Sequence, residues 1–99
     1  MAYLYMVKLS RPLGTDQHRA DLYFGSCKDI NQRMLEHNRG RGAAFLRAAI
    51  ARQISYSLIR LREVPTEREA RQLERKYKRW HNNAKVMNCH KLWSQSDDV

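Results

Sequence analysis

The chain has 99 residues, 42% of them hydrophobic, and this length suits one small domain with a single modest core. Its 19 Lys and Arg residues outnumber its 10 Asp and Glu residues, so the formal net charge at pH 7 is +9. A soluble domain this basic usually binds a polyanion. Lys8 and Arg11 interrupt the N-terminal apolar run, so we expect neither a membrane-spanning helix nor a signal peptide. We predict one domain over residues 1–93 and a polar, mobile C-terminal tail over residues 94–99.

The chain contains two cysteines, Cys27 and Cys89, and neither has a C-x-x-C partner. Two cysteines are too few for a disulfide scaffold, so we expect the protein to reside in the reducing cytoplasm. A single disulfide between the two cysteines is left open as an alternative. Cys89 and His90 are adjacent but have no second pair at zinc-finger spacing, which makes a zinc site a poor interpretation.

Three segments carry the pattern of β-strands. Ala2–Leu9 is dense in aromatic and branched residues, and a turn-rich polar stretch follows it. Asp21–Gly25 is a second short apolar run, so an antiparallel hairpin is the simplest topology for the pair. In Ile54–Arg62 apolar and polar residues alternate and residues that favour β-strands are frequent, which predicts a third strand.

Two helices are predicted between the second and third of these strands. The first runs from Ile30 to about His37, and either Ser26 or Asp29 can cap it. A glycine-rich basic segment ends this helix, because glycine readily adopts positive φ. Ala43–Gln53 is alanine-rich and suits a second helix, with an irregular basic loop as the alternative.

The strongest local signal is a capping box formed by Thr66 and Glu69, at which a longer helix begins. We expect this helix to end near residues 81–83 and residues 84–93 to pack back as an extended segment or short helix. One apolar stripe runs along it at spacings of three and four: Ala70, Leu73, Tyr77 and Trp80. The elements together predict an α/β fold of the α+β type, with a small three-stranded antiparallel sheet flanked by helices.

Several polar side chains have both a structural and a functional interpretation. Tyrosines such as Tyr5 and Tyr23 are favoured in strands, where core packing is the ordinary role. Arg33 and His37 are four residues apart on one helix face, so they can converge on a phosphate or remain solvated. Glu74 lies among basic residues and suits an ion pair with a lysine one turn later, at position 78.

The order of these features resembles the GIY-YIG nuclease family. A tyrosine-bearing strand and a Tyr-x-Gly strand precede a helix with arginine and then His-Asn. A glycine-rich basic loop, a strand and a capped helix with one glutamate follow. The resemblance covers roughly residues 2–88 and is carried by these segments: Tyr3–Tyr5, Leu22–Ser26, Asp29–Asn38, Glu67–Glu74 and Met87–Cys89.

The resemblance implies which side chains perform the chemistry. The implied catalytic set is Tyr5, Tyr23, Arg33, His37, Glu74 and Asn88, with Glu74 as the metal ligand. Two motif positions depart from the family pattern, because no glycine precedes Leu4 and Phe24 replaces isoleucine, but neither position carries a reacting group. The connection over residues 8–20 is also longer than the usual hairpin connection.

The resemblance implies a metal-dependent endonuclease that hydrolyses phosphodiester bonds in DNA, with RNA left open as a substrate. Glu74 would hold a single Mg²⁺ or Mn²⁺, with water and phosphate oxygens filling the other positions. Tyr5 would assist the attack of water and Arg33 would donate to the phosphate. We expect low or structure-based specificity, or a protein partner that supplies specificity.

Basic side chains outside the reacting set are candidates for binding the nucleic-acid backbone: Arg39, Arg41, Arg47, Arg52, Arg71 and Lys78. The alternative function is a non-catalytic, basic nucleic-acid-binding domain, in which tyrosines stack on bases and Glu74 only forms an ion pair. Because the principal polar positions of the family pattern are filled together, the nuclease is the preferred interpretation.

Overall fold

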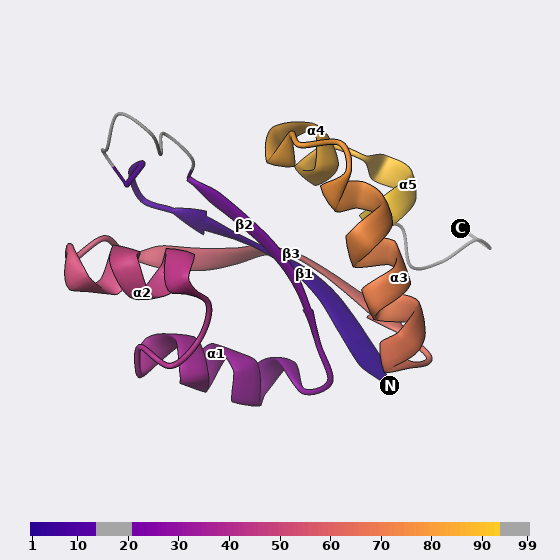
Figure 1. Cartoon of the computed structure of the whole chain (residues 1–99), viewed down its shortest axis with the longest axis horizontal. Helices are drawn as coiled ribbons and strands as arrows, with labels where there is room; N and C mark the ends of the chain where they lie inside the picture. Colours follow the sequence, from indigo (N-terminus) through magenta and orange to yellow (C-terminus); the bar gives the residue numbers. More distant parts are fainter. Residues whose placement is uncertain (14–20, 94–99) are drawn as a thin grey trace.

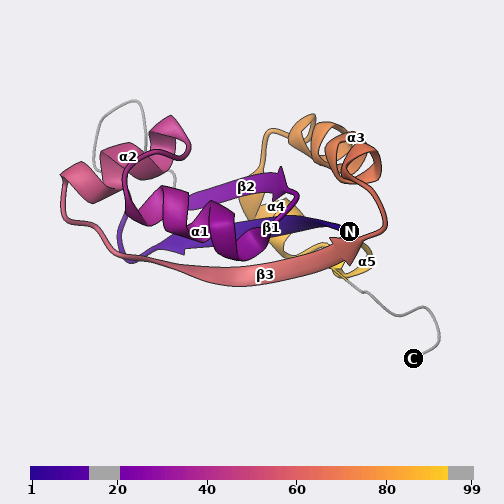
Figure 2. The same ribbon diagram turned by 90° about the horizontal axis from the view of Figure 1, so that it is seen from below.

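The computed structural model describes residues 1–13 and 21–93. A three-stranded antiparallel sheet in the order β2-β1-β3 lies at its centre, formed by β1 (Ala2–Leu9), β2 (Leu22–Cys27) and β3 (Tyr56–Val64). Figure 2 shows β1 between the two edge strands. Six of the eight residues of β1 are buried, because the central strand is covered on both faces and its apolar run is nearly continuous.

Helices cover the sheet on both sides (Figure 1). On one face lie α1 (Ile30–Asn38) and α2 (Ala44–Ala51). On the other lie α3 (Glu67–Lys78), α4 (Asn83–Met87) and α5 (His90–Trp93). The predicted α/β fold, a small three-stranded antiparallel sheet flanked by helices, is therefore confirmed.

The strand pleat divides the core into two main clusters, because successive side chains of a strand point to opposite faces. The first cluster combines β1 with α2 and includes Tyr5, Val7, Leu9, Leu46 and Ala49. The second combines β1 with α3, α4 and α5 and includes Leu4, Met6, Tyr77, Val86 and Leu92. Each face of the sheet thus has its own apolar core, and neighbouring strand residues reach different sides of the molecule.

The predicted helix starts are confirmed, and the structure decides between the alternatives. The Asp29 side chain accepts a hydrogen bond from the Gln32 N–H at 3.1 Å, so Asp29 caps α1 while Ser26 lies within β2. Thr66 Oγ1 accepts from the Glu69 N–H at 3.1 Å, as a cap of α3 should. The alanine-rich segment forms α2, so the alternative of a basic loop there is wrong.

The end of α3 differs from the prediction. The helix ends at Lys78, before residues 81–83, because His81 adopts a positive φ of 50° and the Asn82 side chain caps a new helix, α4. Trp80 therefore lies beyond the helix and is 37% exposed, although its spacing predicted a place in the apolar stripe. The following segment forms two short helices rather than one helix or an extended chain.

The third strand begins and ends two residues later than predicted. Ile54 lies before the strand, yet it is buried in the first cluster, which explains why the apolar pattern starts there. The predicted tail and residues 14–20 of the long connection lie outside the described residues.

Cys27 and Cys89 are both free and belong to clusters on opposite faces of the sheet. The disulfide that the sequence left open is therefore absent. None of the described helices is long and apolar enough to cross a membrane.

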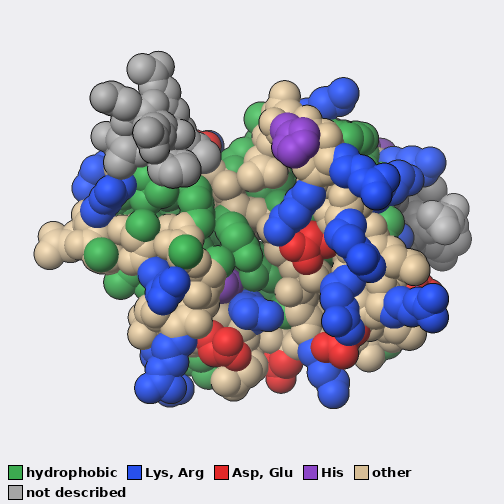
Figure 3. Space-filling model, in the orientation of Figure 1, with side chains coloured by type: hydrophobic (Ala, Val, Ile, Leu, Met, Phe, Trp, Pro, Cys, Tyr) green, Lys and Arg blue, Asp and Glu red, His purple; other side chains and the backbone are tan. Residues whose placement is uncertain are grey.

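The edge formed by β2 is the side of the sheet nearest the viewer in Figures 1 and 3. Figure 3 shows Lys and Arg side chains gathered along α3, with a smaller group over α1 and α2. Hydrophobic side chains lie between the two groups. Basic surface therefore flanks this edge on both sides.

Candidate active site

Tyr5 and His37 form the buried centre of a side-chain cluster. The Tyr5 hydroxyl on β1 lies 3.0 Å from His37 Nε2 on the last turn of α1, and both residues are 1% exposed. The ring of Tyr23, on β2, lies 6.0 Å from each of the other two rings. Three of the predicted catalytic residues therefore meet on the face covered by α1 and α2.

Two glycines permit this close packing. Gly25 is opposite Tyr5 in the β1–β2 ladder, and a Cβ there would approach the Tyr5 hydroxyl to 2.9 Å. A Cβ at Gly42 would lie only 1.8 Å from His37 Nδ1. The Gly42 backbone therefore covers one side of the imidazole, and Nδ1 has no hydrogen-bond partner among the described residues. The nitrogen of His37 that is engaged is Nε2, which faces Tyr5.

Burial sets the protonation states of this pair. Desolvation, and then the neighbouring Tyr23, raise the pKa of the Tyr5 hydroxyl, against an opposing effect of Arg33. Desolvation, and then the Arg33 charge, lower the pKa of His37. At neutral pH Tyr5 is therefore protonated and His37 is neutral. The positive charge of Arg33 lowers the pKa of Tyr5, but burial outweighs it.

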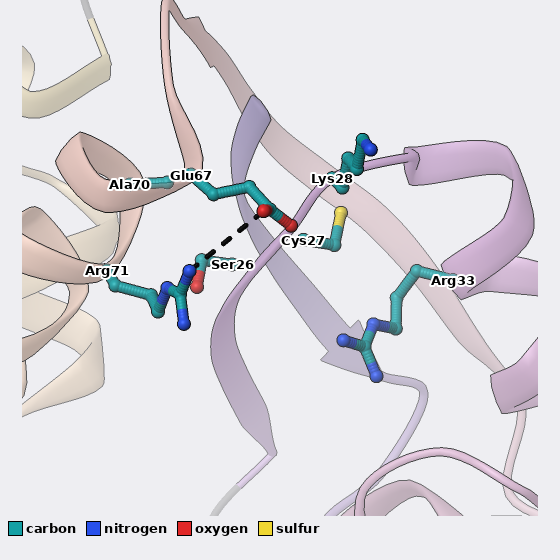
Figure 4. A pocket seen from close by; sticks show the side chains of 7 residues that line it. All are labelled: Ser26, Cys27, Lys28, Arg33, Glu67, Ala70 and Arg71. Atoms are coloured by element: carbon teal, nitrogen blue, oxygen red, sulfur yellow. Dashed lines mark ion pairs between the residues drawn. The ribbon is translucent and has the colours of Figure 1, made fainter. Parts of the chain in front are cut away.

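Arg33 links this cluster to a cavity at the end of β2. It lies one turn before His37 on α1, and its Nη1 is 3.8 Å from Glu36 Oε2. The cavity, of about 170 Å³, is lined by Ser26, Cys27, Lys28, Arg33, Glu67, Ala70 and Arg71. Figure 4 shows Arg33 on the α1 side of β2, and Glu67 with Arg71 on the α3 side. The cavity therefore lies around the end of the edge strand, between the two helices.

Glu74 belongs to the opposite face of the sheet. It lies on α3, and the Ser26 hydroxyl on β2 donates a hydrogen bond to its Oε1. Its Oε2 lies 2.5 Å from Lys78 Nζ, so the ion pair considered in the sequence analysis is present. Ser26 is a site residue that the sequence analysis missed, although it closes the Leu22–Ser26 motif.

The edge strand β2 joins the two halves of the site. Gly25 touches the Tyr5 and Tyr23 rings on one face, while the next residue, Ser26, reaches Glu74 on the other. Adjacent strand residues point to opposite faces, so one peptide unit connects both halves. Five of the six predicted catalytic residues thus lie around this edge: Tyr5, Tyr23, Arg33, His37 and Glu74.

Asn88, the sixth predicted catalytic residue, lies apart from the others. It follows the last turn of α4, where its backbone N–H donates to the Ala84 carbonyl at 3.2 Å. Its side chain is exposed and, within the described part of the chain, makes no hydrogen bond to Tyr5, Arg33 or Glu74.

The six predicted backbone-binding cations have different surroundings. Three of them are exposed on or near α1 and α2: Arg39, Arg41 and Arg47. Arg52 instead donates from Nη1 to the Leu13 carbonyl at 2.7 Å, which ties the chain after β1 to α2. Arg71 pairs with Glu67 at 3.9 Å, and Lys78 pairs with Glu74.

The donors around Glu74 fit a single divalent cation. Residues 1–13 and 21–93 contain no group of three or more His, Cys, Asp or Glu side chains that could hold a metal. Glu74 and Ser26 nevertheless provide hard oxygen atoms, and an ammonium group already lies against the carboxylate. Mg²⁺ commonly binds through one or two carboxylates and keeps several waters, so these donors are of the kind that Mg²⁺ uses.

A family model described as the GIY-YIG catalytic domain matches residues 1–88. The chain therefore belongs to the GIY-YIG family, which confirms the resemblance seen in the sequence. This family is one of nucleases, so the chain is an endonuclease-type enzyme with a nucleic-acid substrate, and members generally depend on a divalent metal. No curated protein and no solved structure matches the chain.

Gly42→Ala tests the role of the backbone beside His37. The new methyl group would displace the imidazole, so we expect at least a tenfold slower cleavage of plasmid DNA and a stability loss of about 1–3 kcal/mol. Gly40→Ala is the control for a methyl group added without a clash, because a Cβ there meets nothing within 4 Å. Its φ of 72° strains an alanine, so this variant also loses stability, but its cleavage rate should stay that of the wild type. Equal cleavage by the two folded variants, with urea unfolding as the stability measurement, would contradict the assignment.

The lowered pKa of His37 predicts a pH-dependent stability. In the unfolded chain a histidine has a pKa of about 6.5, so below that pH the unfolded His37 binds more protons than the folded one. We expect the free energy of unfolding to fall as pH drops from about 6.5 toward the folded-state pKa. The loss should be smaller in His37→Gln. Urea titrations at acidic and neutral pH measure this, and an identical pH dependence in both proteins would refute it.

Proposed function

We propose that this chain is a Mg²⁺- or Mn²⁺-dependent endonuclease that cuts DNA with low or structure-based specificity. The observation that carries the proposal is the hydrogen bond between Tyr5 and His37 beside the edge strand that also holds Glu74 through Ser26. Phosphodiester hydrolysis needs a proton acceptor for water and stabilisation of charge on the phosphate oxygens. The α1 side of β2 offers the Tyr5–His37 pair and Arg33, and the α3 side offers the Glu74 carboxylate.

Tyr5 and His37 take the proton of the attacking water in this proposal. In the His37 tautomer protonated at Nδ1, Nε2 accepts the hydrogen bond from the Tyr5 O–H. As water attacks the phosphorus, the Tyr5 oxygen accepts its proton and passes the phenolic proton to Nε2. Tyr5 then never has to ionise alone, which matters because burial raises its pKa. Tyr23 packs against both rings and holds their orientation.

Arg33 supports the reacting phosphate. Its planar guanidinium offers paired donors to the non-bridging oxygens as their negative charge grows. The side chain is half-buried and lines the cavity at the end of β2, so it is available to a bound strand while α1 restricts its motion. Its charge also opposes the rise of the Tyr5 pKa, which favours proton loss from Tyr5.

Glu74 is the metal ligand in this proposal, and Ser26 orients its carboxylate. When bound, the divalent ion would stabilise negative charge on the phosphate and on the leaving oxygen. Asn88 joins the proposed catalytic set through the family pattern alone, because its exposed side chain lies outside the cluster.

Low sequence specificity follows from the kind of contacts that the described residues offer. Arginines and lysines flank β2, and contacts to phosphates position a nucleic acid without reading its sequence. We therefore propose that this one domain, residues 1–93, selects DNA structure, or relies on a protein partner for sequence. The two free thiols suit the cytoplasmic location that we also propose.

Incubation with supercoiled plasmid, branched DNA and RNA, in Mg²⁺ and in EDTA, tests this function. We expect metal-dependent cleavage of DNA that falls by at least about 100-fold in Tyr5→Phe and in Glu74→Gln. Tyr3→Phe and Glu63→Gln are matched controls, because they remove the same groups from a half-buried strand position and an exposed one, and should cleave normally. Tight binding without any cleavage would instead support a nucleic-acid-binding domain.

A further inference from the structure

Lys78 pairs with the carboxylate that the proposed function assigns to the metal ion. Its Nζ lies 2.5 Å from Glu74 Oε2, whereas the other two ion pairs among the described residues measure 3.8 and 3.9 Å. The Glu74 side chain is only 19% exposed and that of Lys78 is 49% exposed, so the ammonium approaches a recessed carboxylate from the solvent side. The chain thus supplies its own cation to this site.

The carboxylate is fixed independently of Lys78. The Ser26 hydroxyl donates to Oε1, so Glu74 remains anchored to β2 when the ammonium departs. A lysine side chain is long and flexible, and among residues 1–13 and 21–93 Lys78 makes one ion pair. A hollow beside it offers space for another position and is lined by Asp21, Leu22, Lys78, His81, Asn83 and Ala84. Among the described residues, the ion pair with Glu74 is the one polar contact that the departure of Lys78 would break.

We propose that Lys78 is a displaceable stand-in for the metal ion, which neutralises Glu74 in the metal-free protein and pairs with a DNA phosphate once metal displaces it. The inference rests on the proposed function, since it requires a metal at Glu74. An ammonium and a divalent cation repel each other at one carboxylate oxygen, so binding of the metal releases the lysine. Metal and DNA then strengthen each other's binding by the same factor.

The size of the effect on metal affinity follows from the exposure of the ion pair. Partly exposed pairs contribute modestly, so removing Lys78 should tighten metal binding by about two- to fivefold. The effect on DNA should appear in the salt dependence, because each phosphate contact contributes a slope of about 0.9 in a plot of log affinity against log salt.

Calorimetric titration of the full chain with Mn²⁺ tests the first part. We expect Lys78→Met to bind Mn²⁺ about two- to fivefold more tightly than the wild type. Lys76→Met is the matched control, because Lys76 lies on the same helix but its Nζ lies over the Tyr77 ring, 5.4 Å from the centroid. Its affinity should equal that of the wild type, and Glu74→Gln should abolish binding. Equal affinities of the two lysine variants would overturn the proposal.

DNA binding in Ca²⁺ and in EDTA tests the second part, with Tyr5→Phe added to every protein to prevent cleavage. We expect Lys78→Met to lower the salt slope by about 0.9 in Ca²⁺ and to leave it unchanged in EDTA, where Glu74 holds the lysine. Lys76→Met should behave alike in both media. An equal effect of Lys78→Met with and without metal would show an ordinary surface cation and would overturn the proposal.

The outcomes separate this inference from the proposed function. If cleavage depends on Glu74 but Lys78→Met and Lys76→Met bind Mn²⁺ equally well, the nuclease function is retained and the stand-in role of Lys78 is overturned. If Lys78→Met changes Mn²⁺ affinity and the salt slope as expected but the protein cuts no substrate, the stand-in role of Lys78 is retained and the nuclease function is overturned. Mn²⁺ binding that survives Glu74→Gln overturns both the metal assignment and the stand-in.

Discussion

The peptide unit between Gly25 and Ser26 is the constraint on which the site depends. Strand residues alternate between faces, so Gly25, which has no Cβ, faces the two tyrosines, and the Ser26 hydroxyl faces Glu74 on the other side. A Cβ at position 25 would collide with Tyr5 and Tyr23, and a shift of register by one residue would exchange the two faces. The pairing of β2 with β1 therefore fixes the Tyr5–His37 pair and the Glu74 carboxylate relative to each other.

The Tyr5–His37 pair is uncharged, and the Glu74 carboxylate is neutralised by a neighbouring ammonium group. Burial keeps Tyr5 protonated and His37 neutral, and Lys78 compensates the carboxylate of Glu74. Ionising a buried phenol alone is costly, whereas moving a proton along an existing hydrogen bond creates the charge next to its partner. In the proposed mechanism, a bound phosphate and a divalent metal would add charge on both sides of β2 at once.

The elements with local signals could be predicted, because their causes lie within a few residues. The Thr66 cap and the apolar run of β1 are examples. The proposed catalytic set came from the family resemblance, since spacing alone places only Arg33 and His37 on one face. The early end of α3 and the contact of Gly42 with His37 depend on tertiary geometry that no local pattern encodes. Ser26 was missed for the same reason, because its partner lies 48 residues away.

The central claim is that residues on opposite faces of the sheet act as one catalytic unit. A double-substitution cycle on the cleavage rate constant tests it most directly, with Tyr5→Phe, Glu74→Gln and the combined variant compared with the wild type. When two residues act as a unit, substituting either one already removes most of their joint contribution to the rate, so the second substitution adds little. We predict that the double variant cleaves about as slowly as the slower single variant. Rate losses that multiply would show that Tyr5 and Glu74 act independently and would contradict a shared site.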